Sequence, residues 1–288
     1  MLTRIDHIMI CVHDLDRGIE MYRRLGFDVS PGGVHPGRGT HNAIAFHRED
    51  YLEILGVRDA DEYRRAGGGG LLDFLAAGGG LRYIAVQSDD LAADVAAMRG
   101  RDVDVGDVTD GERKTPDGRT LRWRSASLGP RNPLPIFFLQ HLTPLAERRG
   151  RGGEHPNGVQ GIERVYINVT DVGRAAETYA RVLGMPKPKI QRGAVIKADM
   201  AVFDLGPTGL TVAQPMEPGP AAEALAKRGP GPFQALHRTR SMEAAAKWMA
   251  DHGVPPPARG IRNTGEEAML VGPEHTGGLY VGFVGPKR

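Results

Sequence analysis

The stretch IDHIMICVHDLDRGIEMYRRLGF, residues 5–27, decides the fold because it contains a strand, a helix cap and a helix in succession. Its first eight residues are rich in apolar side chains, which predicts a β-strand. Asp14 follows as a helix N-cap, since its side chain can accept a hydrogen bond from the first turn. Apolar residues then recur at helical spacing until Gly26, a residue type that commonly ends helices.

The same pattern returns at residues 162–185, IERVYINVTDVGRAAETYARVLGM, with Asp171 as the cap and Gly184 at the helix end. The exposed faces of the two helices also agree, since Arg17, Glu20 and Arg24 correspond to Arg174, Glu177 and Arg181. Two fainter copies begin near residues 81 and 232, and short β-rich runs follow every helix. The repeat predicts four copies of a βαβββ module.

One βαβββ module leaves a face of its sheet bare, so two modules are expected to pair and enclose a cavity. We predict an α+β fold in which four modules form two domains with curved, barrel-like mixed sheets. The predicted N-terminal domain spans 1–146, with modules at about 4–60 and 80–143, and holds the functional cavity. Residues 147–161 are Gly-rich and charged and read as a linker. The C-terminal domain spans 162–288, with modules at about 162–216 and 232–285.

Composition limits the classes of partner. The 288 residues carry a net charge of only +2, and no basic stripe carries aromatic side chains, so a nucleic-acid partner is not expected. No run approaches the roughly 18 apolar residues of a membrane span, so no membrane is expected. The N-terminus reads as a strand with no signal-peptide order, and the single cysteine, Cys11, fits a reducing compartment. A cytoplasmic protein is expected, and a homodimer stays open.

The first module resembles the vicinal-oxygen-chelate superfamily, which includes glyoxalase I, extradiol dioxygenases, and the fosfomycin and bleomycin resistance proteins. It resembles more narrowly the glyoxalase-like domain family. The runs that carry the resemblance are DHIMICVHDLD (6–16), LGFDVSPGGVHPGRGTHNAIAF (25–46) and YLEILGV (51–57), with PDGRTLRWR and LPIFFLQ in the second module. The resemblance implies a divalent metal bound by one residue on the first strand and one on the last strand of each paired module.

In the first module these two positions hold His7 and Glu53. Glu53 lies among apolar residues, where a carboxylate is costly unless it is paired or bound to metal. Imidazole and carboxylate together suit Mn, Fe, Ni, Co or Zn, and no nucleotide or flavin is expected. In the second module the positions hold Tyr83 and Gln140, of which Gln140 offers only a neutral carbonyl oxygen. Two readings stay open: a metal held by His7, Glu53 and Gln140 with waters or substrate, or a polar pocket without metal.

The third and fourth modules depart further from the superfamily pattern. The corresponding positions hold Arg164 and Thr211 in the third module, and Gln234 and Val281 in the fourth. Ring-cleaving dioxygenase chemistry is therefore disfavoured, and the second pair of modules is expected to be structural or an interaction platform.

The loop GGVHPGRGTHN, residues 32–42, gives the candidate substrate contacts. His35, Thr40 and Asn42 are expected to line the cavity mouth together with Tyr83, although a solvated hairpin is the competing reading.

The resemblance implies a metal-assisted lyase or isomerase that acts on a small oxygenated substrate, with Glu53 and His35 as the groups that move protons. The alternative is a non-catalytic small-molecule binding protein of the bleomycin-resistance type, without metal. The substrate is not named by the sequence.

Overall fold

The computed structural model describes residues 1–115, 118–148 and 153–286. Its first module comprises β1 (Leu2–Cys11), α1 (Leu15–Arg24), β2 (Ser30–His35), β3 (Thr40–Phe46), β4 (Tyr51–Val57), α2 (Ala60–Arg65) and α3 (Leu71–Ala76). The second comprises β5 (Gly80–Ser88), α4 (Leu91–Gly100), β6 (Thr109–Lys114), β7 (Thr120–Ser127), β8 (Ile136–His141) and α5 (Leu145–Arg148). Residues 116–117, in the PDGRTLRWR run, and 149–152, in the predicted linker, lie outside the described residues.

The other two modules repeat this order. The third comprises β9 (Val159–Asn168), α6 (Val172–Leu183), β10 (Gln191–Gly193), β11 (Ala198–Leu205), β12 (Thr208–Pro215) and α7 (Pro220–Arg228). The fourth comprises β13 (Gly231–Thr239), α8 (Met242–Asp251), β14 (Ala258–Ile261), β15 (Glu267–Val271), the 3₁₀ turn η1 (Pro273–His275) and β16 (Tyr280–Val284).

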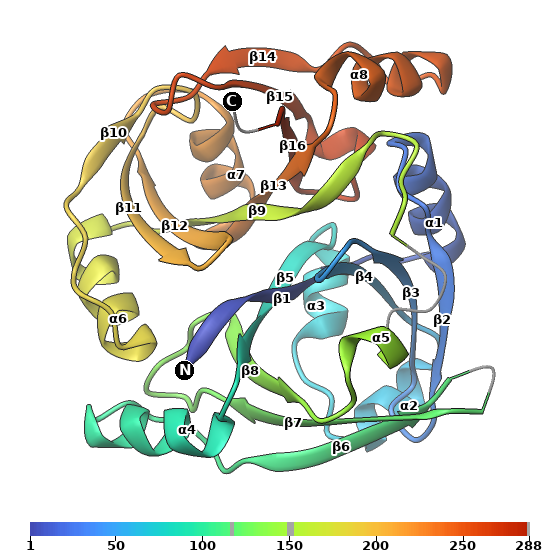
Figure 1. Cartoon of the computed structure of the whole chain (residues 1–288), viewed down its shortest axis with the longest axis vertical. Helices are drawn as coiled ribbons and strands as arrows, with labels where there is room; N and C mark the ends of the chain where they lie inside the picture. The colour runs from blue at the N-terminus through green and yellow to red at the C-terminus, as the bar shows by residue number, and fades with distance from the viewer. Residues whose placement is uncertain (116–117, 149–152, 287–288) are drawn as a thin grey trace. The chain divides into compact units, whose positions relative to one another are not determined.

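Two eight-stranded sheets contain these strands, in the orders β2-β3-β4-β1-β5-β8-β7-β6 and β10-β11-β12-β9-β13-β16-β15-β14 (Figure 1). Both sheets are mixed, because β5 with β8 and β12 with β9 are parallel whereas the flanking hairpins are antiparallel. The second sheet therefore repeats the first strand for strand. This confirms the predicted α+β fold built from four βαβββ modules with curved mixed sheets.

The strand–cap–helix order is confirmed in all four modules. Asp14 accepts a hydrogen bond from Arg17 N at 3.0 Å, and Asp171 accepts one from Arg174 N at 2.9 Å. Asp90 and Ser241 cap α4 and α8 in the same way. The polar side chain at each N-cap satisfies a backbone N–H that the helix leaves unpaired, which sets where each helix begins.

Close contacts group the chain into two compact units that both contribute to each sheet. The first unit comprises Met1–His7, Tyr83–Gly150 and Arg164–Pro232, and so contains most of the second and third modules. The second unit comprises Ile8–Arg82, Arg151–Glu163 and Phe233–Arg288, and so contains most of the first and fourth modules. The domain boundaries near residues 146 and 162 stay a prediction.

The core of the second unit is aromatic and contains three buried histidines. The ring of Phe27 lies 5.3–6.0 Å from the rings of His47, His155 and His237. His47 and His237 have no exposed surface, and His155 is 4 % exposed. Asp50 accepts a hydrogen bond from His47 Nδ1 at 2.6 Å, whereas Nε2 of His47 and Nε2 of His237 have no hydrogen-bond partner among the described residues.

Residues 153–161 of the predicted linker pack into this same unit, whereas Glu147 and Arg148 belong to α5 in the first unit. Asn157 is fully buried and its amide donates to Leu25 O at 2.9 Å. His155 Nδ1 accepts from Asp28 N at 2.9 Å. These bonds hold residues 153–161 against the turn that follows α1, so this segment is part of the core of the unit.

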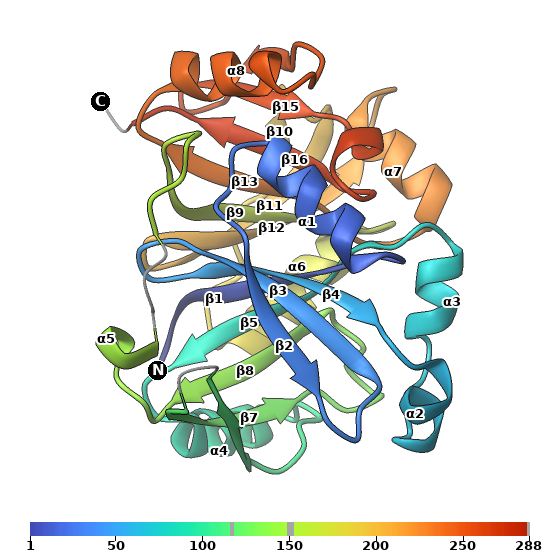
Figure 2. The same ribbon diagram turned by 90° about the vertical axis from the view of Figure 1, so that its right-hand side faces the viewer.

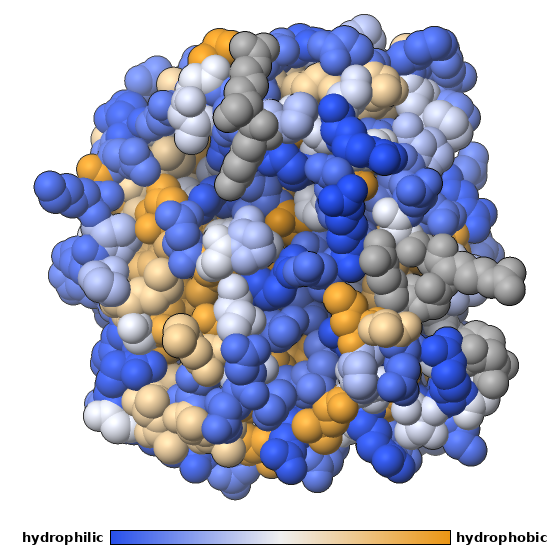
Figure 3. Space-filling model, in the orientation of Figure 1, coloured by the Kyte–Doolittle hydropathy of each residue, from blue (hydrophilic) through white to orange (hydrophobic). Residues whose placement is uncertain are grey.

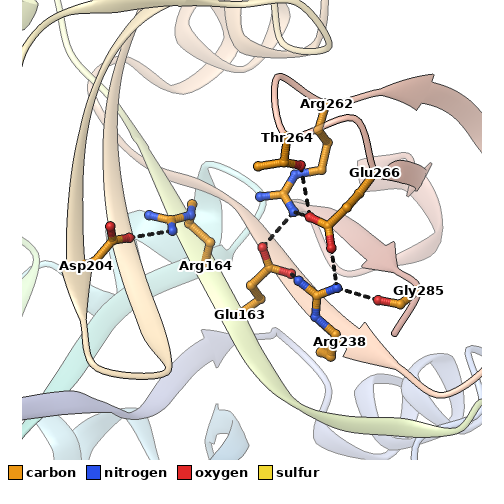
Figure 4. A network of polar contacts seen from close by, with 8 residues as sticks. All are labelled: Glu163, Arg164, Asp204, Arg238, Arg262, Thr264, Glu266 and Gly285. Carbon is orange, nitrogen blue, oxygen red and sulfur yellow. Dashed lines mark hydrogen bonds and ion pairs between the residues drawn. The ribbon is translucent and has the colours of Figure 1, made fainter. Parts of the chain in front are cut away.

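A network of charged side chains connects β9 with the fourth module (Figure 4). Glu163 on β9 accepts hydrogen bonds from Arg238 and Arg262, and Glu266 accepts from the same two arginines. The four side chains are 11–25 % exposed and alternate in sign, which is the arrangement that partly buried charges require. The network therefore joins β13, β9 and the β14–β15 hairpin.

Helix α3 and its neighbour α2 follow β4 along the chain (Figure 2). In the view of Figure 3 the surface is mostly hydrophilic, with hydrophobic side chains in small separate groups. No helix among the described residues is both long and apolar enough to cross a membrane.

Candidate functional site

The polar cluster of the first unit is built around Asp6 on β1. Nδ1 of His7 lies 2.7 Å from Asp6 Oδ1, and Nε2 of His141 on β8 lies 2.7 Å from Asp6 Oδ2. Asp6 has no exposed surface, and His7 is 5 % exposed. The ring of Phe137 meets the ring of His7 edge-on at 5.6 Å. One buried carboxylate thus holds two imidazoles from strands that are far apart in the sequence.

The ionisation of Asp6 fixes the tautomer of His7. Burial by itself raises the pKa of Asp6, but hydrogen bonds from His141 and His7 outweigh burial and hold this pKa well below its usual range. An ionised carboxylate only accepts hydrogen bonds, so the ring nitrogens that face Asp6 carry the hydrogens. In neutral His7 the lone pair is then on Nε2, which is the atom that binds a metal or takes a proton.

Asp6 and His141 are the residues that sequence reasoning missed. Strand alternation places Asp6 on the opposite face from His7, and it also turns His141 away from the face assigned to Gln140. The available signal was Asp6 itself, an acidic residue next to the apolar run of β1, where a buried carboxylate needs a partner.

Gln140 lies on β8 but its amide is engaged at the start of α4. Its Nε2 donates to Asp89 O at 2.8 Å, and its Oε1 accepts from Leu91 N at 3.2 Å. Gln214 on β12 makes the equivalent bond to Val172 N at the start of α6. The repeat of this contact in the third module indicates a structural role for the glutamine. Tyr83, the other candidate of the second module, is 39 % exposed on β5.

In the second unit, Glu53 on β4 is bonded to Asn42 on β3. Asn42 Nδ2 donates to Glu53 Oε1 at 2.7 Å, and both side chains are 9 % exposed. The strand register pairs Ile44 with Glu53 and Asn42 with Leu55, so Asn42 and Glu53 are diagonal neighbours on one face. The two residues therefore share a face, and the amide of Asn42 fixes the orientation of the carboxylate.

His35 and Thr40 form a second pair on the adjacent hairpin. They are register partners of β2 and β3, and Nδ1 of His35 lies 2.8 Å from Thr40 Oγ1. Thr40 is buried and belongs to the same face as Asn42, whereas His41 lies on the other face against Gly56 and α1. The alternation predicted for this strand is therefore confirmed.

Helix α3 covers the face that carries Glu53. Leu71 and Leu75 of α3 pack against Cys11 and Leu55, which lies two residues beyond Glu53 on the same side of β4. The Gly-rich segment 67–80 therefore places a short helix over the sheet. Its flanking glycines Gly70 and Gly79 have φ values of +66° and +63°, which other residues rarely adopt.

The pKa of Cys11 reflects burial and the charges beneath this helix. Burial raises the pKa of the Cys11 thiol to about 12, the negative charge of Glu53 acts in the same direction, and the positive charge of Arg82 opposes it. The guanidinium of Arg82 lies over the ring of Phe74 at 4.8 Å. The face therefore combines a carboxylate, a guanidinium and an inert thiol beneath apolar side chains.

Two of the three predicted metal ligands, His7 and Glu53, have side chains oriented by a hydrogen bond. His7 fits a ligand position, because a carboxylate that fixes the other ring nitrogen is the usual support of a metal-bound imidazole. Glu53 offers a carboxylate oriented by Asn42. The described residues contain no group of three His, Cys, Asp or Glu side chains arranged to hold a metal ion. His7 belongs to the first unit and Glu53 to the second, so the predicted ligand set of His7, Glu53 and Gln140 stays a prediction.

Comparison with known families gives the identity of the fold. The model of the glyoxalase-like domain matches residues 5–183, and that of the glyoxalase/bleomycin resistance protein/dioxygenase superfamily matches residues 163–271. The chain belongs to the glyoxalase-like domain family. The first match begins in β1 and ends in α6, so this glyoxalase-like protein carries the family pattern over more than half of its length.

Solved structures agree with this fold. A hypothetical protein from Staphylococcus aureus is 14 % identical, with 98 % of this chain and 99 % of that chain covered and a TM-score of 0.65. A variant of 4-hydroxymandelate synthase from Streptomyces coelicolor is 15 % identical, with 100 % and 94 % covered and a TM-score of 0.64. A xylose isomerase-like TIM barrel/4-hydroxyphenylpyruvate dioxygenase fusion protein is 12 % identical, with 100 % and 49 % covered and a TM-score of 0.61.

No curated protein matches this chain. At these identities the structural likeness establishes the vicinal-oxygen-chelate fold and leaves the reaction to be argued from the residues.

Proposed function

We propose that this glyoxalase-like protein is a metal-assisted lyase or isomerase that acts on a small oxygenated substrate. The observation that supports the proposal is the Asp6–His7–His141 cluster, in which an ionised, fully buried carboxylate fixes Nδ1–H of His7. A histidine that served only to fill the core would not need a buried charge to set its tautomer. The cost of burying Asp6 is explained if His7 Nε2 has a chemical task.

His7 would hold a divalent ion through Nε2, and Asp6 keeps the ring oriented for that task. When bound, the ion supplies a Lewis acid for an oxygen of the substrate. Glu53 is the proposed proton carrier, because Asn42 holds its Oε1 and so fixes the direction of the carboxylate. His35, held by Thr40, is the second proposed acid–base group. Gln140 would join as a ligand only by weakening its bond to the start of α4.

Metal analysis of protein purified without a histidine tag tests the proposal. Wild type is expected to carry close to one equivalent of a divalent metal, and His7→Ala and Glu53→Gln, each made separately, are expected to lose it. His252→Ala is the matched control, because His252 is an exposed histidine at the C-terminal end of α8 and its replacement should leave the metal content unchanged. Metal-free wild type that gains no thermal stability from added Mn, Fe, Ni, Co or Zn would sink the proposal.

The second candidate function is small-molecule binding without catalysis. It is favoured by Gln140, whose amide is committed to the backbone at the start of α4. Under this reading Glu53, Arg82 and the apolar side chains of α3 recognise a ligand, and no ion is needed. Metal-free wild type and His7→Ala that bind a small oxygenated ligand equally well would favour this second function.

A further inference from the structure

The third module carries polar side chains on the sheet face that α6 does not cover. Helix α6 packs on the face of β11 that carries Phe203, whose ring lies 6.1 Å from Tyr179. The register pairs Phe203 with Leu210 and Asp204 with Gly209, and it pairs Gly209 with Arg164 on β9. Arg164 is therefore on the opposite face from α6, and Thr211, two residues after Gly209, shares that face.

Arg164 is held in a fixed position on this face. Its Nη2 donates to Asp204 Oδ1 at 2.7 Å (Figure 4). The guanidinium lies over Gly209, where a Cβ would clash with Nη1. Figure 4 also shows the side chain of Arg164 pointing away from the network of its neighbour Glu163. The absence of a side chain at residue 209 thus makes room for the guanidinium.

Three polar atoms on this face are buried and lack a hydrogen-bond partner among the described residues. They are Arg164 Nη1, Thr211 Oγ1 and Asn168 Oδ1. Thr211 has no exposed surface and Asn168 is 1 % exposed, whereas the side chain of Arg164 keeps 15 % exposure at the end of the face next to exposed Asp204. Leaving buried polar groups unsatisfied is costly, so Arg164 Nη1 and Thr211 Oγ1 on neighbouring strands call for a ligand that completes them, whereas Asn168 lies four residues further along β9 and bonds to α7.

We propose that this face binds a small hydroxycarboxylate. The carboxylate accepts from Nη1 of Arg164, because a guanidinium with one nitrogen already paired offers its other nitrogen to an anion. The ligand hydroxyl bonds to Thr211 Oγ1, which can both donate and accept. Asn168 lies further along β9, where its Nδ2 donates to Ala221 O of α7 at 2.8 Å, and it takes no part in holding the ligand. The site is independent of His7 and Glu53.

This inference revises the expectation that the second pair of modules is only structural. The positions that carry metal ligands elsewhere in the superfamily hold Arg164 and Thr211 here, and these two side chains suit an anion with a hydroxyl group. A guanidinium at one position and a hydroxyl group at the other are not what a purely structural sheet face needs.

Thermal unfolding with four probes tests the proposal: lactate and 3-hydroxybutyrate as hydroxycarboxylates, propionate as a carboxylate without the hydroxyl, and sulfate as an anion alone. At a concentration of about ten times its dissociation constant, at least one hydroxycarboxylate should raise the midpoint temperature of unfolding by on the order of 3 °C. Propionate and sulfate should raise this temperature less. Arg164→Met and Thr211→Val should abolish the rise. Arg192→Met, which removes an exposed arginine paired with Asp199, should keep it.

Thr211→Val adds a readout that does not depend on the probe. If the hydroxyl is unsatisfied in the free protein, its replacement by a methyl group of the same shape should leave the midpoint unchanged or raise it. A lower midpoint would show that the hydroxyl is bonded within the fold and would overturn the proposal. So would a rise with sulfate equal to that with both hydroxycarboxylates, a rise retained in Arg164→Met, or no rise with any probe.

Discussion

Asp6 shows how one buried charge can organise its surroundings. The carboxylate has no exposed surface, and each of its oxygens accepts a hydrogen bond from a different histidine. Two charge-assisted bonds of this kind offset the loss of hydration, whereas one alone would leave an oxygen unsatisfied. The residue therefore acts on both stability and chemistry, because it ties β1 to β8 and sets the tautomer of His7.

Replacing this charge is expected to destabilise the protein. Asp6→Asn keeps the shape of the side chain but turns one acceptor into a donor, which then faces a ring N–H. The free energy of unfolding should fall by about 3 kcal/mol, measured by urea denaturation at pH 7. Asp61→Asn is the control, because Asp61 is exposed and should change stability by less than about 0.5 kcal/mol. A loss as small as that of the control would contradict the role assigned to Asp6.

Residue patterns predicted one half of the candidate site and missed the other. Thr40 and Asn42 were placed on one face by period-two alternation, which holds in a regular strand such as β3, and Glu53 was found as a carboxylate among apolar residues of β4. The bond between Asp6 and His141 joins residues 135 positions apart, and strand alternation carries no information about such a partner. The second histidine that bonds to Asp6 could therefore be found only from the tertiary structure.

At the scale of elements, α3 is a small helix with a specific position. Its buried residues Leu71 and Leu75 pack against Cys11, and glycines with positive φ flank it on both sides. A six-residue helix has little stability of its own, so packing of its apolar side must hold it in place. Local opening of α3 should therefore require much less free energy than unfolding of the whole chain.

Cys11, the single cysteine, can report this opening. Native wild type should react slowly with a thiol reagent, because the thiol is buried and its pKa is raised to about 12. Leu71→Ala with Leu75→Ala should speed the reaction by at least about tenfold, since each truncation removes roughly 2 kcal/mol of packing. Leu91→Ala removes a buried leucine of α4 and should leave the rate nearly unchanged. Equal acceleration in both variants would mean that Cys11 reacts only through global unfolding.

The long helices could be predicted and the small elements could not. Helices α1 and α6 combine a polar N-cap, an apolar stripe and a glycine at or just after the last turn, and each of these signals is local. Helices α3 and α7 and the edge strands β2, β10 and β14 lack such signals, because Gly- and Pro-rich segments form them only when a neighbouring strand or sheet face is present.

At the scale of the molecule, contacts group modules in a way that chain order did not predict. Within the second unit, Tyr22 OH of α1 donates to Thr276 O, and Asn157 donates to Leu25 O. Within the first, Arg101 after α4 donates to Arg181 O of α6 at 2.8 Å. The repeat predicted which modules share a sheet, but helix-side contacts depend on side chains that have no periodic signature.

The buried histidines of the second unit make its stability depend on pH. Burial lowers the pKa of His155 to about 3 and holds the pKa of His237 well below its usual value, and the nearby His47 adds to both shifts. Asp50 faces His47 and Asp28 presents only its backbone N–H to His155, so neither carboxylate is bonded to His155 or His237. In the unfolded chain these histidines titrate near 6.5, so protons bind the unfolded state first.

The stability that these neutral histidines provide is complete above about pH 6.5 and is lost as the pH falls toward 3. Between pH 7 and 5 the free energy of unfolding should fall by up to about 2 kcal/mol for each histidine, measured by urea denaturation. His155→Asn keeps an acceptor for Asp28 N but cannot be protonated. Between pH 7 and 5 its free energy of unfolding should therefore fall by up to about 2 kcal/mol less than that of wild type. His13→Asn, at an exposed position, should keep the wild-type slope. The stability that ionised Asp6 contributes is lost only below about pH 4, because the pKa of Asp6 is lowered in the fold. A free energy of unfolding that stays constant from pH 7 to 5 would therefore contradict the role of the histidines.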